Sequence, residues 1–556
     1  MTEQLRQAID TLTLEGMPFA IDTCEKTGEK TYLAQPESLR AIYEAAKDHG
    51  DACYMAYDDE QWTFSQTLER AAKLGHYLAD NGIGQGDRVA IAMRNYPEWM
   101  TSFIAITAIG GVAVALNSWG SGEELNYGVK DSQSKAIIGD SDRLDRLTEL
   151  EALTDILAIC CRSEVNASYV QWQDIMQQRN ETEFPAQTIA DDSAPALIMY
   201  TSGTTGQPKG AVSSNKAVLS GLMNVEMSGA IVAMQHPEVL EKIMNNPHQS
   251  GALLTVPLFH VSGLHACTLP ALRRGSKVVM MYKWDAKEAL KLIDEHNLQS
   301  VSGAPMVVEN FLDEAEAQNK SLDHLFSLAS GGQAQPAHLT QKVKDRVPNG
   351  MIGAGYGMTE ANSTICSVAG NTYLCNPTSC GYSLPIVDLE LRDDNGEVVG
   401  DGERGEIFVR GPMLMTEYYG RPEATQKVLV DGWYASGDIG QFCDKGLLHI
   451  VDRKKDMIIR GGENIYCAEV EAVLLAHDEI LECCSFGLPH DTWGEELAMV
   501  VVAKPGSDLS AEGVQMYIKQ HLANYKVPTK VYFSEQALPR NTLNKILKPA
   551  VKAQYQ

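Results

Sequence analysis

Short apolar runs alternate with helical patterns along most of the chain, and this alternation limits most strongly what the chain can fold into. LERAAKLGHYLADNGI, which begins at Leu68, has helical periodicity and precedes the strand-like RVAIAM. Three later runs, ALIMY, GALLTVPL and KVVMMY, are rich in aliphatic residues and typical of buried strands. The pattern therefore predicts an α/β architecture.

The chain has 556 residues, too many for one compact core, so we expect at least two domains. Strand-like pieces become denser after about residue 385, and a basic stretch, VDRKKDMIIRGG, begins at residue 451. The C-terminal segment beyond this stretch has the pattern of a small α+β unit, in which Ser510 is a candidate helix cap. We predict a large multi-subdomain N-terminal α/β domain over residues 1–453 and a small C-terminal α+β domain over residues 454–556.

The charge and the cysteines exclude several classes of protein. A formal net charge of -27 repels nucleic acid and anionic lipid, so neither is an expected main partner. The 12 cysteines include no C-x-x-C pair, which argues against a zinc site or a disulfide framework and for a reducing compartment. No signal peptide is apparent, so we expect a cytoplasmic protein. The apolar stretch 103–116 favours a buried helix and strand over a transmembrane segment, although weak contact with a membrane surface stays open.

A glycine-rich polar loop, YTSGTTGQPKG at residues 200–210, ends the run ALIMY. Glycines let backbone N–H groups approach an anion, the hydroxyls add donors, and Lys209 supplies a positive charge. The nucleotide P-loop requires glycine before this lysine and Ser or Thr after it, whereas Pro208 and Gly210 stand here. The loop therefore predicts a phosphate site of another kind. An ordinary polar loop is the alternative.

A second glycine cluster, GAGYGMTE at residues 353–360, fails the dinucleotide-binding pattern because Met358 stands where the third glycine is required. The side chains of this cluster still suggest a ligand site. The ring of Tyr356 can stack on a base, and the carboxylate of Glu360 can hold Mg²⁺. Taken alone, the segment is better explained as a turn.

Three later positions carry weaker signals. Asp438, in DGWYASGD, can accept both hydroxyls of a ribose or can simply end a turn. Arg453 and its basic neighbours form either a solvated hinge or an anion-contacting surface. Lys545 lies in a polar loop near the C-terminus, where most lysines are merely solvated.

Taken in order, YTSGTTGQPKG, YGMTE, GWYASGD, DRKKDMIIRGGENIY and PRNTLNK resemble the motifs of the adenylate-forming superfamily. That superfamily contains acyl-CoA synthetases, adenylation domains of peptide synthetases and beetle luciferases. The similarity extends from about residue 60 to the end of the chain. PLFHVSGLHA, SGGQAQP and RGGENIYCAEVE are most similar to bacterial fatty acyl-CoA synthetases. The resemblance implies a ligase that uses ATP and Mg²⁺ to convert a carboxylic acid to an acyl-adenylate and then transfers the acyl group to CoA.

The resemblance also implies an ATP site. The glycine-rich loop would enclose the β- and γ-phosphates, Tyr356 would lie against adenine, and Glu360 would hold Mg²⁺. The residues implied to bind ATP or AMP are Thr201, Ser202, Gly203, Thr204, Thr205, Lys209, Gly332, Gln333, Tyr356, Gly357, Thr359, Asp438 and Arg453.

The resemblance further implies three catalytic residues, Lys545, Thr359 and His260. Lys545 would bridge the substrate carboxylate and the α-phosphate, and Thr359 would touch the α-phosphate. His260 would orient the substrate carboxylate, with a simply packed histidine as the alternative. Asn544 stands before Lys545 where the family usually has glycine, and its tolerance of a left-handed backbone suits the same loop.

In this superfamily the C-terminal domain rotates between the two half-reactions. Lys455 matches the pivot. Rotation would withdraw Lys545 and bring Gly461, Gly462 and Glu463 to the site, opening a path for CoA. The sequence does not fix an oligomeric state and is compatible with a homodimer.

The acid itself is less well specified by the sequence. We expect its pocket among residues 225–229, 260–265, 303–306 and 357–361, where small residues are common and favour a medium- or long-chain fatty acid. One alternative is a ligase that acts on an aryl or other acid, or passes the acyl group to a carrier protein or an amine. Another is a non-catalytic nucleotide-binding relative, which would not need Lys545.

Overall fold

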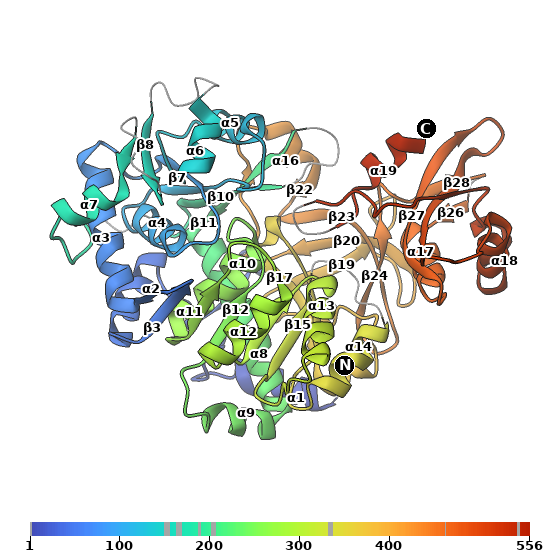
Figure 1. Cartoon of the computed structure of the whole chain (residues 1–556), viewed down its shortest axis with the longest axis horizontal. Helices are drawn as coiled ribbons and strands as arrows, with labels where there is room; N and C mark the ends of the chain where they lie inside the picture. Colours follow the sequence, from blue (N-terminus) through green and yellow to red (C-terminus); the bar gives the residue numbers. More distant parts are fainter. Residues whose placement is uncertain are drawn as a thin grey trace. The chain divides into compact units, whose positions relative to one another are not determined.

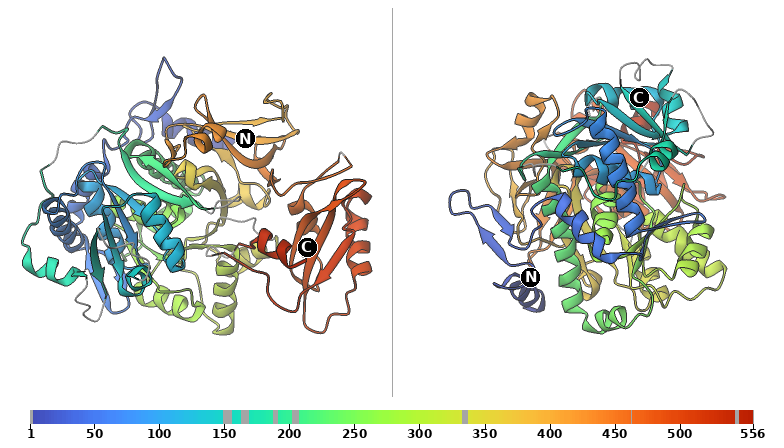
Figure 2. Two further views of the ribbon diagram at one scale, coloured as in Figure 1. Left: turned by 90° about the horizontal axis from the view of Figure 1, so that it is seen from above. Right: turned by 90° about the vertical axis from the view of Figure 1, so that its left-hand side faces the viewer.

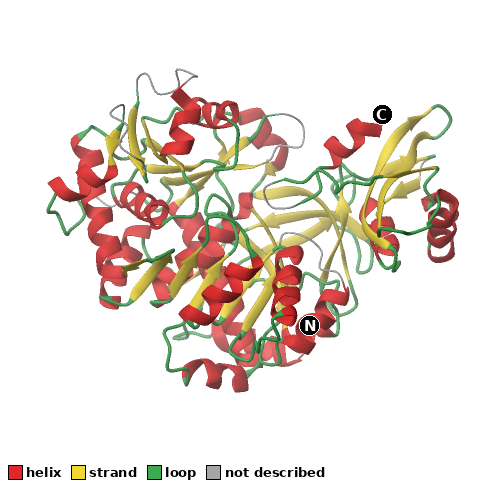
Figure 3. Cartoon of the chain, in the orientation of Figure 1, coloured by secondary structure: helices red, strands yellow, loops and turns green. Residues whose placement is uncertain are grey.

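The computed structural model describes residues 3–148, 156–162, 169–186, 191–201, 207–331, 337–461, 463–541 and 545–555 (Figure 1). Contacts divide the chain into two compact units, Met1–Asp388 with Arg410–Gly432, and Leu389–Val409 with Trp433–Gln556. Helices and strands are mixed in both units (Figure 3), which confirms the predicted α/β class. The second unit groups residues 389–409 and 433–453 with the C-terminal residues. The predicted boundary near residue 453 is that of a C-terminal domain expected to rotate, and it stays a prediction.

The largest sheet of the first unit has eight strands in the order β21-β11-β10-β6-β5-β7-β8-β9. Neighbouring strands from β10 to β9 run parallel, whereas β11 is antiparallel to both β10 and β21. The strands are β5 (Arg88–Ala92), β6 (Val112–Ala115), β7 (Ala136–Asp140), β8 (Leu157–Cys161), β9 (Val170–Gln171), β10 (Pro195–Thr201), β11 (Lys209–Ser214) and β21 (Glu417–Tyr418).

A second sheet of six strands has the order β15-β14-β12-β13-β3-β4. All neighbours are parallel except β3 and β4, which form an antiparallel pair. The strands are β3 (Cys53–Tyr57), β4 (Glu60–Thr63), β12 (Gly251–Leu254), β13 (Lys277–Met280), β14 (Ser300–Gly303) and β15 (Ser327–Ser330). Parallel strands need crossover connections, and the helices that alternate with them in sequence supply these connections.

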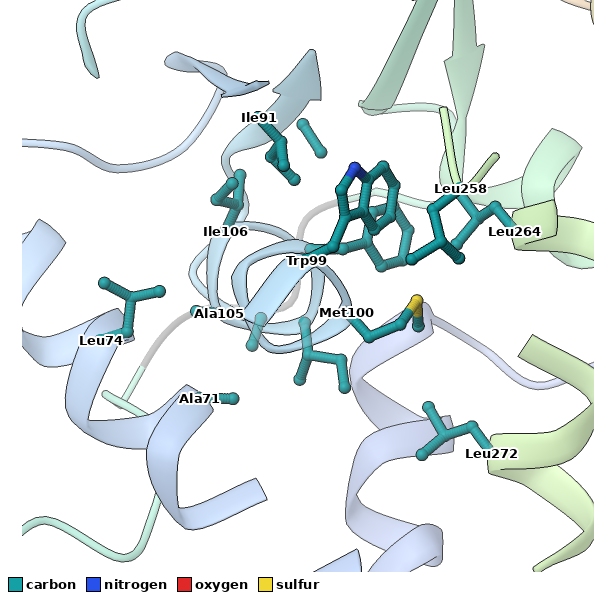
Figure 4. Close-up of a cluster of buried hydrophobic side chains, with 14 of the residues drawn as sticks. Ala71, Leu74, Ile91, Trp99, Met100, Ala105, Ile106, Leu258, Leu264 and Leu272 are labelled. Carbon is teal, nitrogen blue, oxygen red and sulfur yellow. The ribbon is translucent and has the colours of Figure 1, made fainter. Parts of the chain in front are cut away.

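Helix α4 (Pro97–Ala108) is buried along its whole length. Its side chains Trp99 and Met100 point toward Leu258 and Leu264, and Leu74 of α3 (Phe64–Asp80) lies on the opposite side of the helix (Figure 4). An α-helix that is apolar on every side must be enclosed by protein. Together with β6, this helix accounts for the apolar stretch 103–116 and confirms that it forms a buried helix and strand.

The other helices of the first unit are α1 (Glu3–Thr13), α2 (Leu39–Ala46), α3 (Phe64–Asp80), α5 (Gly122–Asp131), α6 (Ser141–Thr148), α7 (Trp172–Gln178), α8 (Asn215–Gln235), α9 (Pro237–Met244), α10 (Val261–Gly263), α11 (Leu269–Arg274), α12 (Ala286–His296), α13 (Pro305–Ala317), α14 (Ala337–Arg346), α15 (Gly370–Leu374) and α16 (Pro422–Val428). Within the described part of the chain, α8 alone is long and apolar enough to cross a membrane, but 61% of its most apolar window is buried in the protein. Burial of that kind is typical of a core helix.

A small sheet of three strands, β16 (Gly353–Met358), β17 (Ser363–Ala369) and β18 (Tyr382–Ser383), packs against α8. The N-terminal helix α1 lies beside the same helix, as the right-hand view in Figure 2 shows. A two-stranded hairpin, β1 (Ile21–Thr23) and β2 (Lys30–Tyr32), follows α1. The first unit ends with β22 (Leu429–Val430).

The second unit contains β19 (Asp388–Arg392), β20 (Arg404–Arg410), β23 (Trp433–Phe442) and β24 (Leu448–Arg453), which follow one another in a sheet. A further sheet holds β25 (Ile458–Arg460), β26 (Glu463–Ile465), β27 (Ile480–His490), β28 (Gly494–Ala503) and β29 (Lys530–Phe533), with helices α17 (Cys467–Leu475), α18 (Ala511–His521) and α19 (Lys548–Tyr555). Ser510 caps α18 by accepting a hydrogen bond from the Gly513 backbone N–H, as predicted.

Candidate active site

The glycine-rich loop connects two antiparallel strands. Thr201, the last residue of β10, pairs with Lys209, the first residue of β11. The Thr201 hydroxyl donates a hydrogen bond of 3.4 Å to the Lys209 carbonyl, and Tyr127 donates one of 2.9 Å to the Pro208 carbonyl. These contacts hold the two ends of the loop. The predicted phosphate-binding residues Ser202, Gly203, Thr204 and Thr205 lie outside the described residues.

The Lys209 ammonium contacts a residue that the sequence did not indicate. Its nitrogen lies 4.9 Å from the centre of the Tyr418 ring, a cation–π distance. The Tyr418 hydroxyl in turn donates a hydrogen bond of 2.8 Å to Oε1 of Glu360. Tyr418 reaches this position because β21 pairs with β11, which brings it opposite Ala211. No local motif marks Tyr418, since its place depends on this pairing of distant strands.

Glu360 lies in a tight turn between β16 and β17. A short 3₁₀ turn, Thr359–Ala361, is followed by Asn362 and Ser363 with positive φ values of 50° and 107°. Gly357 is required beside this turn, because a Cβ there would lie 1.8 Å from the Ser363 carbonyl oxygen. The Glu360 carbonyl also accepts a hydrogen bond of 2.7 Å from the Met415 N–H. The turn therefore presents Thr359 and Glu360 from a fixed backbone.

Several predicted residues follow the carboxyl ends of neighbouring parallel strands. β12, β14 and β15 are adjacent in the second sheet and end at Leu254, Gly303 and Ser330. The segment after β12 carries His260, whose ring lies 4.4 Å from that of Phe259. The predicted adenine contacts Gly332 and Gln333 follow β15 and lie outside the described residues. Ligands of open α/β sheets bind at this edge of the sheet, so the placement suits a substrate site.

His265, one helical turn after His260, is fully buried. It lies in a π-helical turn, Leu264–Thr268, and such turns occur frequently at functional sites. Burial lowers its pKa to about 4, so the ring is neutral at physiological pH. His260 itself is partly exposed, and its role toward a substrate carboxylate stays a prediction.

In the second unit, Asp438 and Arg453 are direct partners across β23 and β24. The Arg453 Nε lies 3.2 Å from Asp438 Oδ1, and the Asp438 side chain is only 11% exposed. The Ser436 hydroxyl accepts a hydrogen bond of 3.1 Å from the Asp438 N–H. Two residues that the resemblance implies to bind ATP or AMP therefore lie side by side.

Lys545 approaches the same pair from the C-terminal end of the chain. Burial lowers the pKa of its ammonium, the nearby Arg453 lowers it further, and Asp438 opposes this shift. The backbone around Lys545 is fixed by Asn541, whose side chain accepts a hydrogen bond of 2.9 Å from the Lys545 N–H. The fold of the second unit thus brings the lysine close enough to Asp438 and Arg453 for their charges to act on its ammonium. Asn544 lies outside the described residues.

The predicted pivot and CoA-path residues also lie in the second unit. Lys455 lies just after β24 and is exposed, while the neighbouring Lys454 forms 3.0 Å ion pairs with Asp394 and Glu406. Gly461 has a positive φ of 60° and its N–H donates to the Trp493 carbonyl at 2.8 Å. Glu463 begins β26, and Gly462 lies outside the described residues. The pivot and the CoA path stay predictions.

Comparison with known proteins assigns this fold to a class. The model of the AMP-binding enzyme family matches residues 42–419, and that of the AMP-binding enzyme C-terminal domain matches residues 469–545. The long-chain-fatty-acid–CoA ligase of Bacillus subtilis is 31% identical over 541 residues, covering 92% of this chain and 93% of the relative. A feruloyl-CoA synthase of an Amycolatopsis species is 32% identical over 494 residues, covering 89% and 94%.

Two solved structures of o-succinylbenzoate CoA synthetase (MenE) from Bacillus subtilis are also similar. One contains the acyl-adenylate intermediate and the other contains ATP and a magnesium ion. Each aligns with a TM-score of 0.77 and 27% identity, over 92% of this chain and 97% or 98% of the other. The fold is therefore that of the adenylate-forming superfamily. The chain belongs to the AMP-binding enzyme family, and it is an AMP-forming acid–thiol ligase.

Proposed function

We propose that this enzyme activates a medium- or long-chain fatty acid with ATP and transfers the acyl group to CoA, in the cytoplasm. The observation that carries the proposal is the position of Lys545 in the second unit, close enough to the paired Asp438 and Arg453 for their charges to act on its ammonium. Shifted pKa values beside other charged groups are common at functional sites. A lysine in this position is suited to neutralise charge at the α-phosphate of a nucleotide whose ribose is held by Asp438 and Arg453.

In the first half-reaction, a carboxylate oxygen attacks the α-phosphorus of ATP and pyrophosphate leaves. Lys545 neutralises the charge that accumulates on the carboxylate and α-phosphate oxygens, and Thr359 donates a hydrogen bond to the phosphate. Asp438 and Arg453 hold the ribose hydroxyls. Lys209 and the loop that precedes it bind the β- and γ-phosphates as they depart.

Glu360 fits Mg²⁺, because this ion is usually held by one or two carboxylates together with substrate phosphates. The bound ion would neutralise phosphate charge. The hydrogen bond from Tyr418 to Oε1 of Glu360 fixes the orientation of the carboxylate. In the second half-reaction, the thiol of CoA attacks the acyl carbon, its proton is lost, and AMP leaves.

The proposal is tested by incubating the protein with ATP, Mg²⁺, CoA and a panel of saturated fatty acids and aryl acids, with AMP as the readout. We expect AMP and acyl-CoA to form in equal amounts. Among the acids of the panel, a fatty acid should have the highest kcat/KM. AMP from no acid would refute the proposed reaction. Replacing CoA by pantetheine, an amine or a carrier protein tests transfer to another acceptor.

A second candidate substrate is an aryl acid. The feruloyl-CoA synthase relative is as similar to this chain as the fatty acid ligase is, which supports including ferulate and related acids. A kcat/KM that is highest for an aryl acid would decide for this candidate. Adenylation and thioester formation would be common to both.

A further inference from the structure

The N-terminal segment, residues 3–38, covers one face of the long helix α8. Glu29 forms an ion pair with Lys216, the Ser220 hydroxyl donates a hydrogen bond of 2.9 Å to Gln35, and Tyr32 donates one of 3.0 Å to Asn224. The three positions on α8 are spaced four residues apart and so form one stripe along the helix. Both Tyr32 and Asn224 are buried, which makes this a specific anchor rather than a surface contact.

The same stripe of α8 is bonded to β17. The Asn224 amide donates a hydrogen bond of 3.3 Å to the Thr364 carbonyl, and the hydroxyls of Ser228 and Ser367 lie 2.5 Å apart. Thr364 is the partner of Gly357 in the β16–β17 pair, next to the turn that carries Thr359 and Glu360. Helix α8 and β17 therefore form a wall that leads away from the proposed reaction centre.

A narrow cavity lies at the far end of this wall. Its lining includes Ser228, Ile231 and Val232 of α8 and Ser367 of β17. Residues of β18 also line it, and α1 contributes Leu5 and Ile9. Ser228 belongs to the stretch 225–229 where the sequence predicts the acid pocket. Since a strand rises about 3.3 Å per residue, Ser367 lies roughly 10 Å along β17 from Thr364. A hydrocarbon tail bound along the wall would end near this cavity.

The helix that closes the cavity has an amphipathic pattern. Leu5, Ala8 and Leu12 of α1 are buried, while Gln7 on the same helix is exposed. The match to the AMP-binding enzyme family begins at residue 42, beyond the whole N-terminal segment. The segment is thus an element of this chain that the family match does not explain.

We propose that α1 is the floor of the acid pocket and that Leu5 and Ile9 set the longest tail the enzyme accepts. This inference rests on the proposed function, and it adds a residue-level determinant of chain length. The hydrogen bonds through Tyr32 and Asn224 hold the segment on α8, which keeps the floor in place. Shortening a floor residue lengthens the pocket, and enlarging it shortens the pocket.

The test compares full-length Ile9→Ala and Ile9→Trp with the wild type over saturated acids of increasing chain length, measuring kcat and KM. We expect Ile9→Ala to move the optimum to longer acids, with a kcat/KM for the longest acids at least tenfold above wild type. We expect Ile9→Trp to raise KM for the longest accepted acid at least tenfold. Both variants should leave KM for ATP and for the shortest accepted acid unchanged.

Gln7→Trp, on the exposed side of the same helix, is the matched control and should keep the wild-type profile. If Ile9→Trp does not fold, as judged by its Tm, the Ile9→Ala arm decides. An unchanged chain-length profile in Ile9→Ala, or an equal loss for all acids in Ile9→Trp, would overturn the inference. Absence of AMP from the wild type with every acid would instead refute the proposed function, so the two failures are distinct.

Discussion

The hydroxyl of Tyr418 donates a hydrogen bond of 2.8 Å to the carboxylate of Glu360, although the two residues belong to separate motifs of the sequence. The Tyr418 ring also lies 4.9 Å from the ammonium of Lys209. One buried tyrosine thus connects the residue proposed to hold Mg²⁺ with the lysine proposed to hold the terminal phosphates. This relationship leads to the first prediction.

Tyr418→Phe keeps the ring against Lys209 and removes the hydrogen bond to Glu360. A hydrogen bond to a charged group contributes about 1.5–3 kcal/mol. We therefore expect KM for MgATP to rise about tenfold or more, with KM for the acid unchanged, in steady-state assays at varied Mg²⁺. Tyr419→Phe is the control, since the Tyr419 hydroxyl lies 3.4 Å from Gln133 Oε1, which is a long and weak contact. Equal effects of the two substitutions would argue against the role given to Tyr418.

Gly357→Ala should disturb the turn that carries Thr359 and Glu360. The new Cβ would lie 1.8 Å from the Ser363 carbonyl oxygen, so the backbone of β17 must shift. We expect a loss of about 1–3 kcal/mol in the free energy of unfolding, together with a higher KM for ATP. At Gly355 the nearest contact is 3.3 Å, so Gly355→Ala should cost much less. Denaturant titration of both variants checks the difference, and similar losses would contradict it.

Lys545→Ala should abolish the first half-reaction and spare the second. Removing a group that stabilises charge in the transition state typically costs 10²–10³-fold in rate. Adenylation, measured as pyrophosphate release, should fall by about this factor, while thioester formation from supplied acyl-adenylate continues. Lys519→Ala, on an exposed site of α18, should affect neither step. Normal adenylation by Lys545→Ala would remove the basis of the proposed mechanism.

The lowered pKa of Lys545 also predicts how adenylation depends on pH. The ammonium is charged below its pKa and loses its charge as pH rises through that value, at a lower pH than an ordinary lysine would. Adenylation should therefore decline on the alkaline side. Lys545→Arg keeps the charge and should move this decline to higher pH even if its rate is reduced. An alkaline decline identical in both proteins would assign it to another group.

Asp452 predicts a pH-dependent stability of the second unit. Burial raises its pKa to about 6, above the ordinary value of 3.8. Between these two pH values the folded state binds more protons than the unfolded state does, so the contribution of this group to stability falls as pH rises. Relative to Asp452→Asn, the wild type should lose up to about 3 kcal/mol between pH 4 and pH 7. Urea titrations at both pH values measure this, with Asp444→Asn in an exposed turn as control. A pH-independent difference would show that Asp452 is not the group responsible.

Local patterns in the sequence predicted a large part of this protein. The alternation of apolar runs and helical patterns predicted the α/β class. Both faces of a parallel sheet are buried, so each of its strands is a nearly continuous run of apolar residues. The order of five short motifs indicated the superfamily. The fully buried helix α4 also followed from its composition.

The contacts between distant segments were decided only by the tertiary structure. Tyr418 reaches Glu360 because β21 pairs with β11, and nothing near Tyr418 in sequence encodes that pairing. The fold of the second unit brings Lys545 close enough to Asp438 and Arg453 for their charges to act on it, and burial there lowers the pKa of the lysine. Helix α1 closes a cavity against α8 by the same kind of long-range packing. Sequence patterns record whether a residue is buried and how the local backbone turns, whereas partners and charge environments arise only when the chain brings separate segments together.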